Sequence, residues 1–374
     1  MTVQQKAFKS RRRYNQWVTN QTLEDFALRY TPVSARRWSA KRVVMTALSA
    51  ITFLALEAIG GALTLTYGFN YVVVAVILVS IIIFALSMPI AINAAKNGLD
   101  IDLLTRGAGF GYLGSTVTSL IYASFTFIFF ALEAAIMAMA LNMLFGLPLH
   151  FGYLIGSVVV IPLVTWGFTF ISRFQQFTQF CWLALQLLPF IFILIREHHV
   201  LQNWIDFPGF ITARDGSFDF LQLGAVCSVL LSLVSQVGEQ VDQVRFLPKP
   251  QHPARWRWYG AVIAAGPGWV VIGAIKILLG SFLAVLAFNY GLGAELASEP
   301  THMYLVAFSY VTHSSSTLLA LTGIFVVLSQ LKINVTNAYA GSIAWSNFFL
   351  RLTHRHPGRV RSEERRVGKE CRSR

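Results

Sequence analysis

The sequence contains little charge for its size. Only 13% of its 374 residues are Asp, Glu, Lys or Arg, whereas 55% are hydrophobic. Soluble domains carry about 25% charged residues, so this shortage argues against a water-soluble globular protein. Cysteine is also scarce: the chain has three, and no two of them form a C-x-x-C pair, which argues against a disulfide framework or a cysteine-based metal site.

Long apolar stretches fill most of the chain instead. A helix needs roughly 20 mostly apolar residues to cross a bilayer. We mark eight such stretches, at about 43–67, 71–95, 112–144, 150–171, 174–195, 218–241, 258–289 and 303–350. The last stretch is too long for one crossing, so we expect a partly buried or tilted segment before a span centred near 320–345. The sequence therefore predicts an all-α integral membrane protein.

The basic residues cluster at alternate ends of these stretches. Residues 1–42 are rich in Lys and Arg, and the loops after the second, fourth and sixth spans add more, whereas the opposite loops carry mainly acidic residues. This is the positive-inside pattern. We therefore interpret the net charge of +13 as a topology signal rather than a nucleic-acid surface. It predicts a bacterial-type inner-membrane protein with a cytoplasmic N-terminal segment, whose partners are lipid and a small solute.

The composition changes abruptly near the end of the sequence. Residues 361–374 resemble the translation of a sequencing adapter, and we exclude them from the fold. On that interpretation the membrane domain, residues 43–355, is truncated and the gene continues beyond Val360. The alternative is a genuine basic tail that contacts anionic lipid.

Charged residues inside the apolar stretches mark candidate functional positions, because each costs several kcal/mol to insert in a membrane. They are Glu57, Glu133, Glu239, Asp242, Lys276 and Lys332. The alternative is that some of them pair with each other or with the backbone and only hold helices together.

Two spans carry signs of an interrupted helix. Gly60 and Gly61 lie in the middle of the first span, soon after Glu57, and each glycine weakens a helix by about 1 kcal/mol. The sixth span ends in a polar run, residues 235–242. Transporters use interrupted helices to bind ions and polar solutes near the middle of the membrane. The alternative for the glycines is a close contact between two helices.

Within the polar run of the sixth span, Gln236 and Glu239 are candidate solute ligands. Asp242 and Arg245 are three residues apart, so they can form a local ion pair at the end of the span. That structural role is the one we favour for these two residues.

The third and eighth spans supply further candidates. Phe129 and Glu133 share one helical face, and a ring beside a carboxylate suits a planar ligand that carries N–H groups. A phenylalanine in a span is otherwise a packing residue. Lys332, Asn334 and Asn337 form a polar set in the eighth span, where the carboxamides can both donate and accept hydrogen bonds.

Several motifs, in order along the chain, resemble those of the nucleobase-cation-symport family of purine, cytosine and hydantoin permeases. The resemblance covers residues 24–355 or so. Its motifs are Arg36-Arg37-Trp38, Asn97-Gly98-Leu99-Asp100 with Leu104-Thr105-Arg106, Phe110-Gly111-x-x-Gly114-Ser115, Asp242-x-x-Arg245-Phe246-x-Pro248, and Asn334-x-x-Asn337-x-Tyr339-x-Gly341.

The resemblance implies a twelve-span fold with a five-plus-five inverted repeat, of which about eight spans are present, and a central site between spans one, three, six and eight. It puts Phe129 in the place of a stacking Trp and Glu133 in that of a Gln that hydrogen-bonds the ring. The predicted solute ligands are Glu57, Gly60, Phe129, Glu133, Gln236, Glu239, Asn334 and Asn337, and the predicted cytoplasmic motif residues are Arg106, Asp242 and Arg245.

The chain also departs from the family pattern. A second stacking Trp is replaced by the apolar stretch 229–233, and hydroxyl residues that help to bind sodium are replaced by Lys332 and Ile333. The Lys332 ammonium can stand in for the cation, which argues against sodium coupling.

Two functions follow as hypotheses. The first is a secondary active permease for a nucleobase-like or other small planar nitrogen compound, coupled to a proton or to no cation. The second is a ligand-sensing input domain of a hybrid sensor histidine kinase. We expect no enzyme activity or cofactor for the chain as given, because no nucleophile, metal cluster or phosphate loop stands out in it.

Overall fold

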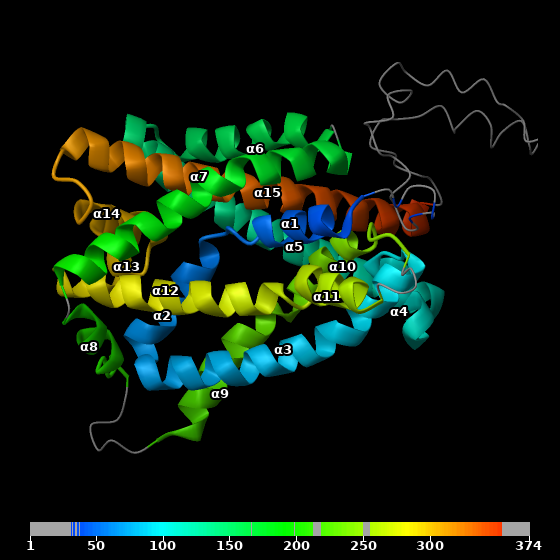
Figure 1. The fold of residues 1–374 in the computed structure, drawn as a ribbon, viewed down its shortest axis with the longest axis horizontal. Coiled ribbons are helices and arrows are strands. Elements are labelled where there is room, and N and C mark those ends of the chain that lie inside the picture. The colour runs from blue at the N-terminus through cyan, green and yellow to red at the C-terminus, as the bar shows by residue number, and fades with distance from the viewer. Residues whose placement is uncertain are drawn as a thin grey trace, which may run out of the picture.

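The computed structural model describes residues 31, 33, 36, 38–165, 167–197, 199–211, 218–249 and 255–353. Every regular element in these ranges is a helix. Figure 1 shows the longer helices running side by side along one axis of a bundle. Six helical stretches of the described part are long and apolar enough to cross a membrane. The predicted adapter sequence and most of the basic N-terminal segment lie outside the described residues, so those predictions stay untested.

The first span is interrupted, as predicted, but not at the predicted place. Helix α1 (Ala40–Ser49) ends before a non-helical stretch, residues 50–54, and helix α2 (Ala55–Tyr67) follows it. Gly60 and Gly61 lie within α2, so the prediction that they mark the break is wrong.

The two glycines instead allow a close contact between helices. A Cβ on Gly60 would overlap the carbonyl oxygen of Ile277 in helix α12, and a Cβ on Gly280 of α12 would overlap the backbone of Glu57. Small residues on both sides thus let the backbones of α2 and α12 approach each other. This was the alternative interpretation of the sequence, and it explains why Gly60 is needed.

Helices occupy predicted spans two to five, but the fourth is shorter than predicted and is not one of the six stretches long enough to cross a membrane. The helices are α3 (Phe69–Asn97), then α4 (Ile101–Thr105), a π-helical turn η3 (Arg106–Phe110) and α5 (Gly111–Phe145) as one span, α6 (Leu149–Thr165) and α7 (Gly167–Arg196). The Asp100 carboxylate caps α4 by accepting a hydrogen bond from the Leu103 N–H at 2.9 Å. Glycines with positive φ end two of these helices, at Gly98 and Gly146.

The remaining spans include the second predicted interruption. A short α8 (Val200–Ile205) precedes α9 (Phe220–Leu231), a 3₁₀ turn η4 (Ser232–Ser235) and α10 (Gln236–Val244). The sixth span therefore leaves α-helical geometry at 232–235, directly before the polar run, and the run itself is helical. Helices α11 (Arg255–Ala265) and α12 (Trp269–Asn289) follow.

The last predicted stretch is divided as expected. Two short helices, α13 (Ala294–Ala297) and α14 (Pro300–Ser309), precede the long α15 (Ser315–Thr353). Most side chains of α14 are buried, including Tyr304, which confirms the prediction of a buried segment before the final span.

Helices α5 and α15 pack against each other along much of their length. Gly341 lies against Thr126, and Gly323 lies against Leu144, so the two helices are antiparallel. Because the two contacts are equally far apart along both helices, this register places Glu133 of α5 level with Asn334 of α15. The polar residues of the third and eighth spans therefore lie in the same layer of the bundle.

Candidate functional site

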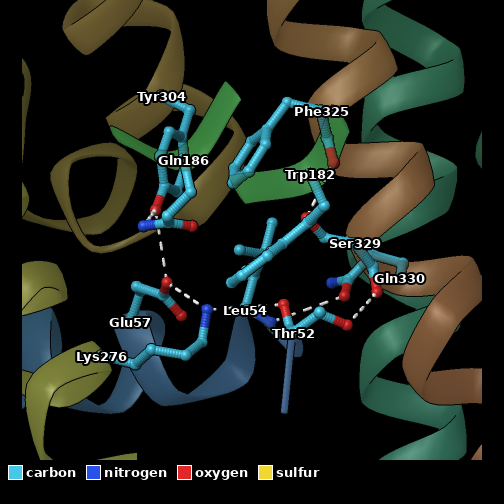
Figure 2. Close-up of polar contacts among 10 residues, drawn as sticks. All are labelled: Thr52, Leu54, Glu57, Trp182, Gln186, Lys276, Tyr304, Phe325, Ser329 and Gln330. Atoms are coloured by element: carbon cyan, nitrogen blue, oxygen red, sulfur yellow. Dashed lines mark hydrogen bonds and ion pairs between the residues drawn. The ribbon is translucent and has the colours of Figure 1, made fainter. Parts of the chain in front are cut away.

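The break in the first span is held by polar groups of α12 and α15. The Thr52 hydroxyl donates a hydrogen bond to the Ser329 carbonyl at 3.0 Å, and the Leu54 N–H donates one to Gln330 Oε1 at 3.5 Å. The Lys276 Nζ donates to the Thr52 carbonyl at 3.4 Å. Figure 2 shows these groups converging on the interrupted helix. Backbone groups freed by the break are thus matched by polar side chains of other spans.

A buried ion pair lies beside the break. Lys276 Nζ is 2.6 Å from Glu57 Oε1, and both side chains are almost fully buried. The Tyr304 hydroxyl donates to the same carboxylate at 3.3 Å, and Gln186 Nε2 donates to the Tyr304 oxygen at 2.7 Å (Figure 2). A buried ion pair is tolerated only when further hydrogen bonds compensate for lost solvation, and this chain of donors supplies them.

Aromatic side chains form the wall next to this pair. Lys276 Nζ lies 5.3 Å from the centroid of the Trp182 ring, a cation–π distance. Trp182 Nε1 donates to Ser329 Oγ at 2.9 Å, and its ring stacks on Phe325 with centroids 6.5 Å apart. The aromatic wall therefore joins α7, α12 and α15.

A second part of the site lies between α5, α15 and the break. Glu133 is fully buried, and neither of its carboxylate oxygens makes a hydrogen bond of good geometry among the described residues. Its polar neighbours include the Gln330 side chain and the Ala55 backbone N–H, with the Glu57–Lys276 pair close enough to influence its charge. Glu133, which the sequence predicts to be a solute ligand, is therefore a buried carboxylate that can accept further hydrogen bonds.

The same layer holds further unused donors and acceptors. Both amide atoms of Asn334, the amide nitrogen of Asn337 and that of Gln330 lack partners within the described part of the chain. All three side chains are buried. A buried polar group without a partner costs about 1–3 kcal/mol, so several together are typical of a ligand site rather than a structural core.

Aromatic rings flank these polar groups. Phe129 of α5 meets Phe53 of the break edge to face, with centroids 6.1 Å apart, and it lies 4.6 Å from Phe125. Only 8% of Phe129 is exposed. The ring therefore belongs to the wall between the break and α5, and its predicted stacking on a solute stays a prediction.

Lys332 ties α15 to α7. Its Nζ donates to the Gln175 carbonyl and to the Thr178 hydroxyl, each at 3.0 Å, while Gln175 Nε2 donates to the Lys332 carbonyl at 2.7 Å. The ammonium is thus held by neutral oxygens, which is the ligand type that a hard cation prefers.

The polar run of the sixth span forms a separate buried group. Gln236 donates to Glu239 within α10. Asp242 Oδ1 lies 3.7 Å from Arg245 Nη2, which confirms the predicted local ion pair, and Asp242 Oδ2 accepts a hydrogen bond from the Tyr122 hydroxyl at 3.3 Å. Arg245 is fully buried, so this end of the bundle is tightly packed.

Arg106 does not join this group in the structure. It is exposed at the start of the π-helical turn, where its guanidinium lies 5.1 Å from the Tyr112 ring centroid. Two residues of the motif at 97–100 are tightly held. Asp100 accepts a hydrogen bond from Asn347 Nδ2 at 3.0 Å, and burial raises its pKa to about 8. Position 98 requires glycine because a Cβ there would overlap the Arg36 guanidinium.

Sequence reasoning missed several residues of the site, among them Trp182, Gln186, Tyr304 and Gln330. Trp182 and Gln186 are four residues apart, so they share a helix face in the fifth span. An aromatic ring and a carboxamide on one face of a span could have indicated a binding surface. Tyr304 carried none, because a tyrosine in an apolar stretch is common.

The fold is similar to that of solved transporters. Mhp1, a nucleobase-cation-symport-1 family transporter, in a closed conformation with bromovinylhydantoin bound, matches with a TM-score of 0.63 and 15% identity over 87% of this chain and 70% of that chain. The inward-facing conformation of Mhp1 matches with a TM-score of 0.57 and 15% identity over 87% of this chain and 75% of that chain. No family model and no curated protein matches the sequence. The chain is therefore a multi-pass membrane protein with an Mhp1-like transporter fold.

Proposed function

We propose that the chain is a secondary transporter of the nucleobase-cation-symport type that moves a small planar nitrogen compound without sodium. The observation that carries this proposal is a layer of buried polar atoms beside the interrupted first span that make no hydrogen bond of good geometry within the described residues. These atoms are the Glu133 carboxylate oxygens, the Gln330 amide nitrogen and both amide atoms of Asn334. Broken helices near the middle of the membrane are where transporters of this kind bind their solutes.

The chemistry of this layer supports a flat, polar solute. A carboxylate and carboxamides supply acceptors and donors in the layer, and the rings of Phe53 and Phe129 close one side of it. The likeness to Mhp1 with bromovinylhydantoin bound supports a small ring compound. Asn337, with its unpartnered amide nitrogen, lies one helical turn from Asn334 and extends the same polar surface.

The absence of sodium coupling is supported by two lysines. In transporters with broken helices, freed backbone carbonyls coordinate the coupling ion. Here Lys276 Nζ contacts the Thr52 carbonyl and the Glu57 carboxylate, and Lys332 Nζ contacts a carbonyl and a hydroxyl of α7. We propose that these ammonium groups take the part of a bound cation, so that transport is coupled to a proton or to no ion.

The basic residues support a bacterial inner-membrane protein with a cytoplasmic N-terminus. The start of α1, together with α4, α10 and α11, lies at one end of the bundle (Figure 1). Basic residues of this end include Lys41, Arg42, Lys96, Arg255 and Arg257. By the positive-inside rule we assign this end to the cytoplasm, which makes the buried Asp242–Arg245 group part of a closed inner end.

The proposal is tested by uptake into proteoliposomes that contain the purified chain. Labelled cytosine, uracil and hydantoin would be offered with sodium, without sodium, and with an inward proton gradient. We expect saturable uptake of at least one compound that is unchanged when sodium is replaced by choline. Uptake that requires sodium would overturn the coupling, and no uptake of any planar compound would overturn transport.

A sensor input domain is the second candidate. The fixed ammonium groups of Lys276 and Lys332 would suit a site that binds its solute without an ion-driven cycle. A planar compound that raises the unfolding temperature of the chain but is never accumulated in proteoliposomes would favour this function. The decisive follow-up is ligand-dependent autophosphorylation of the full-length gene product.

A further inference from the structure

We propose that the solute of the central site is a planar amidine or guanidine, bound through two parallel N–H groups by the carboxylate of Glu133. This inference rests on the proposed function and names the chemical class of the solute. It starts from the observation that neither oxygen of one fully buried carboxylate makes a hydrogen bond of good geometry within the described residues, although two neutral donors, the Gln330 side chain and the Ala55 N–H, lie beside it.

The carboxylate is not neutralised by the lysine nearest to it in the network. Lys276 is already bound by Glu57 at 2.6 Å and by the Thr52 carbonyl at 3.4 Å. The other buried lysine of the region, Lys332, donates to Gln175 and Thr178 on α7. The donors beside the Glu133 carboxylate, the Gln330 side chain and the Ala55 N–H, are neutral and do not compensate for a buried negative charge. Burying an uncompensated carboxylate is costly, so the site favours a ligand that brings positive charge or strong N–H donors.

The geometry of a carboxylate favours one arrangement of donors. Its two oxygens accept two parallel N–H groups, as in the bidentate pairing of a carboxylate with a guanidinium. An N–C–N edge with hydrogen on both nitrogens therefore fits Glu133. A ureide presents a carbonyl oxygen next to its N–H, and that oxygen would face a carboxylate oxygen of like charge.

The neighbouring carboxamides complete the recognition. Asn334 is level with Glu133 across the α5–α15 contact, and its amide nitrogen and oxygen are both unpartnered in the described structure. A carbonyl elsewhere on the solute ring can accept from that nitrogen. Gln330 accepts from the Leu54 N–H through its Oε1, and its amide nitrogen lies beside the Glu133 carboxylate without a hydrogen bond of good geometry in the described structure, so it can serve as a second donor to the solute.

Two small compounds form a matched test pair. Creatinine is a cyclic guanidine whose protonated form has hydrogen on both nitrogens of its N–C–N edge. 1-Methylhydantoin is the corresponding cyclic ureide, with oxygen in place of the exocyclic nitrogen. Binding to the full chain, purified in detergent, would be measured by isothermal titration calorimetry. We expect creatinine to bind at least about tenfold more tightly, the order expected from one charge-assisted hydrogen bond.

The variant Glu133→Gln tests the assigned residue. A carboxamide offers one acceptor and one donor, so the preference for creatinine should fall to about onefold or reverse toward 1-methylhydantoin. The matched control is Glu295→Gln, the same change at an exposed position of α13, which should keep the wild-type preference. A cooperative unfolding transition in each variant, at a temperature no lower than that of the wild type, would show that both variants are folded.

The outcomes separate this inference from the proposed function. If the wild-type chain binds 1-methylhydantoin or uracil as tightly as creatinine, the preference for an amidine or guanidine is wrong and a planar solute still stands. If the preference for creatinine persists in Glu133→Gln, another residue recognises the N–C–N edge and the assignment of that role to Glu133 is wrong. If none of these compounds binds, the inference and the proposed planar solute fail together.

Discussion

The ammonium of Lys276 on α12 lies 2.6 Å from the carboxylate of Glu57 on α2, at the end of the break in the first span. The pair joins two helices whose backbones are in direct contact at Gly60 and Gly280. Charge and close packing therefore stabilise the same junction, and the helix break is adjacent to it.

Removal of one partner of this pair should be strongly destabilising. We expect Lys276→Met to lower the free energy of unfolding by about 3–5 kcal/mol, because Glu57 would then be buried without a counter-charge. The double variant Glu57→Gln with Lys276→Met should recover much of this loss. Unfolding in detergent by a denaturant series would measure both, and a double variant no more stable than Lys276→Met would contradict the coupling.

The glycines of the α2–α12 contact give a second prediction. Gly60→Ala should destabilise the protein by about 1–3 kcal/mol, because the added methyl group overlaps the Ile277 carbonyl. The control is Gly260→Ala on α11, where a Cβ meets nothing within 4 Å. That change should stabilise by about 0.5–1 kcal/mol, the difference between alanine and glycine in a helix. Equal effects at both positions would show that the α2–α12 contact is not tight.

A third prediction concerns pH and a residue at the start of α14, outside the six candidate spans. The hydrogen bond from His302 to Glu299, 2.8 Å long, raises the pKa of His302. A raised pKa in the folded state contributes stability that is fully present below the unfolded value of about 6.5 and is lost as pH rises through the folded value. Because the pair is partly exposed, the contribution should be below about 1 kcal/mol.

The variant His302→Gln tests this sign. Its unfolding temperature should lie below that of the wild type at pH 6 and approach it at pH 9. Glu299→Gln should show the same convergence, because it removes the partner instead. A difference that grows with pH for either variant would contradict a stabilising protonated histidine.

A fourth prediction concerns the Lys332 ammonium. If this ammonium replaces a bound cation between α7 and α15, Lys332→Ser should leave the Gln175 carbonyl oxygen and the Thr178 hydroxyl oxygen without a positively charged partner. We expect solute uptake by this variant to be low in choline and to rise several-fold with sodium. A response of the variant to sodium no larger than that of the wild type would contradict the assignment.

The spans and the interruptions could be predicted from the sequence for physical reasons. An apolar stretch of about 20 residues is long enough for one helix to cross a bilayer, so such stretches can be located in the sequence. The polar run that follows η4 indicated that the sixth span is irregular. The position of the break in the first span could not be predicted from the helix propensities of its residues. Gly60 and Gly61 looked like helix breakers, yet α12 holds them in a helix, whereas the break at 50–54 is stabilised by Ser329 and Gln330 from the far end of the chain.

The candidate site was only partly predictable. A buried carboxylate such as Glu133 is visible in sequence because nothing apolar explains it. Glu133 lies level with Asn334 because α5 and α15 pack in an antiparallel register, and that register is a property of the tertiary structure. The pairing of Glu57 with Lys276 likewise joins residues more than two hundred positions apart, so sequence reasoning could list both and still not pair them.

The most direct test of the account is counterflow of a labelled planar solute in sodium-free proteoliposomes. The wild type and Asn334→Ala would be compared, with Asn93→Ala as a control, because the Asn93 side chain is exposed and donates to the Pro89 carbonyl of its own helix. The account predicts exchange by the wild type and Asn93→Ala, and a loss of at least about tenfold in Asn334→Ala. No exchange without sodium, or equal exchange by all three proteins, would contradict a sodium-independent solute site at the broken first span.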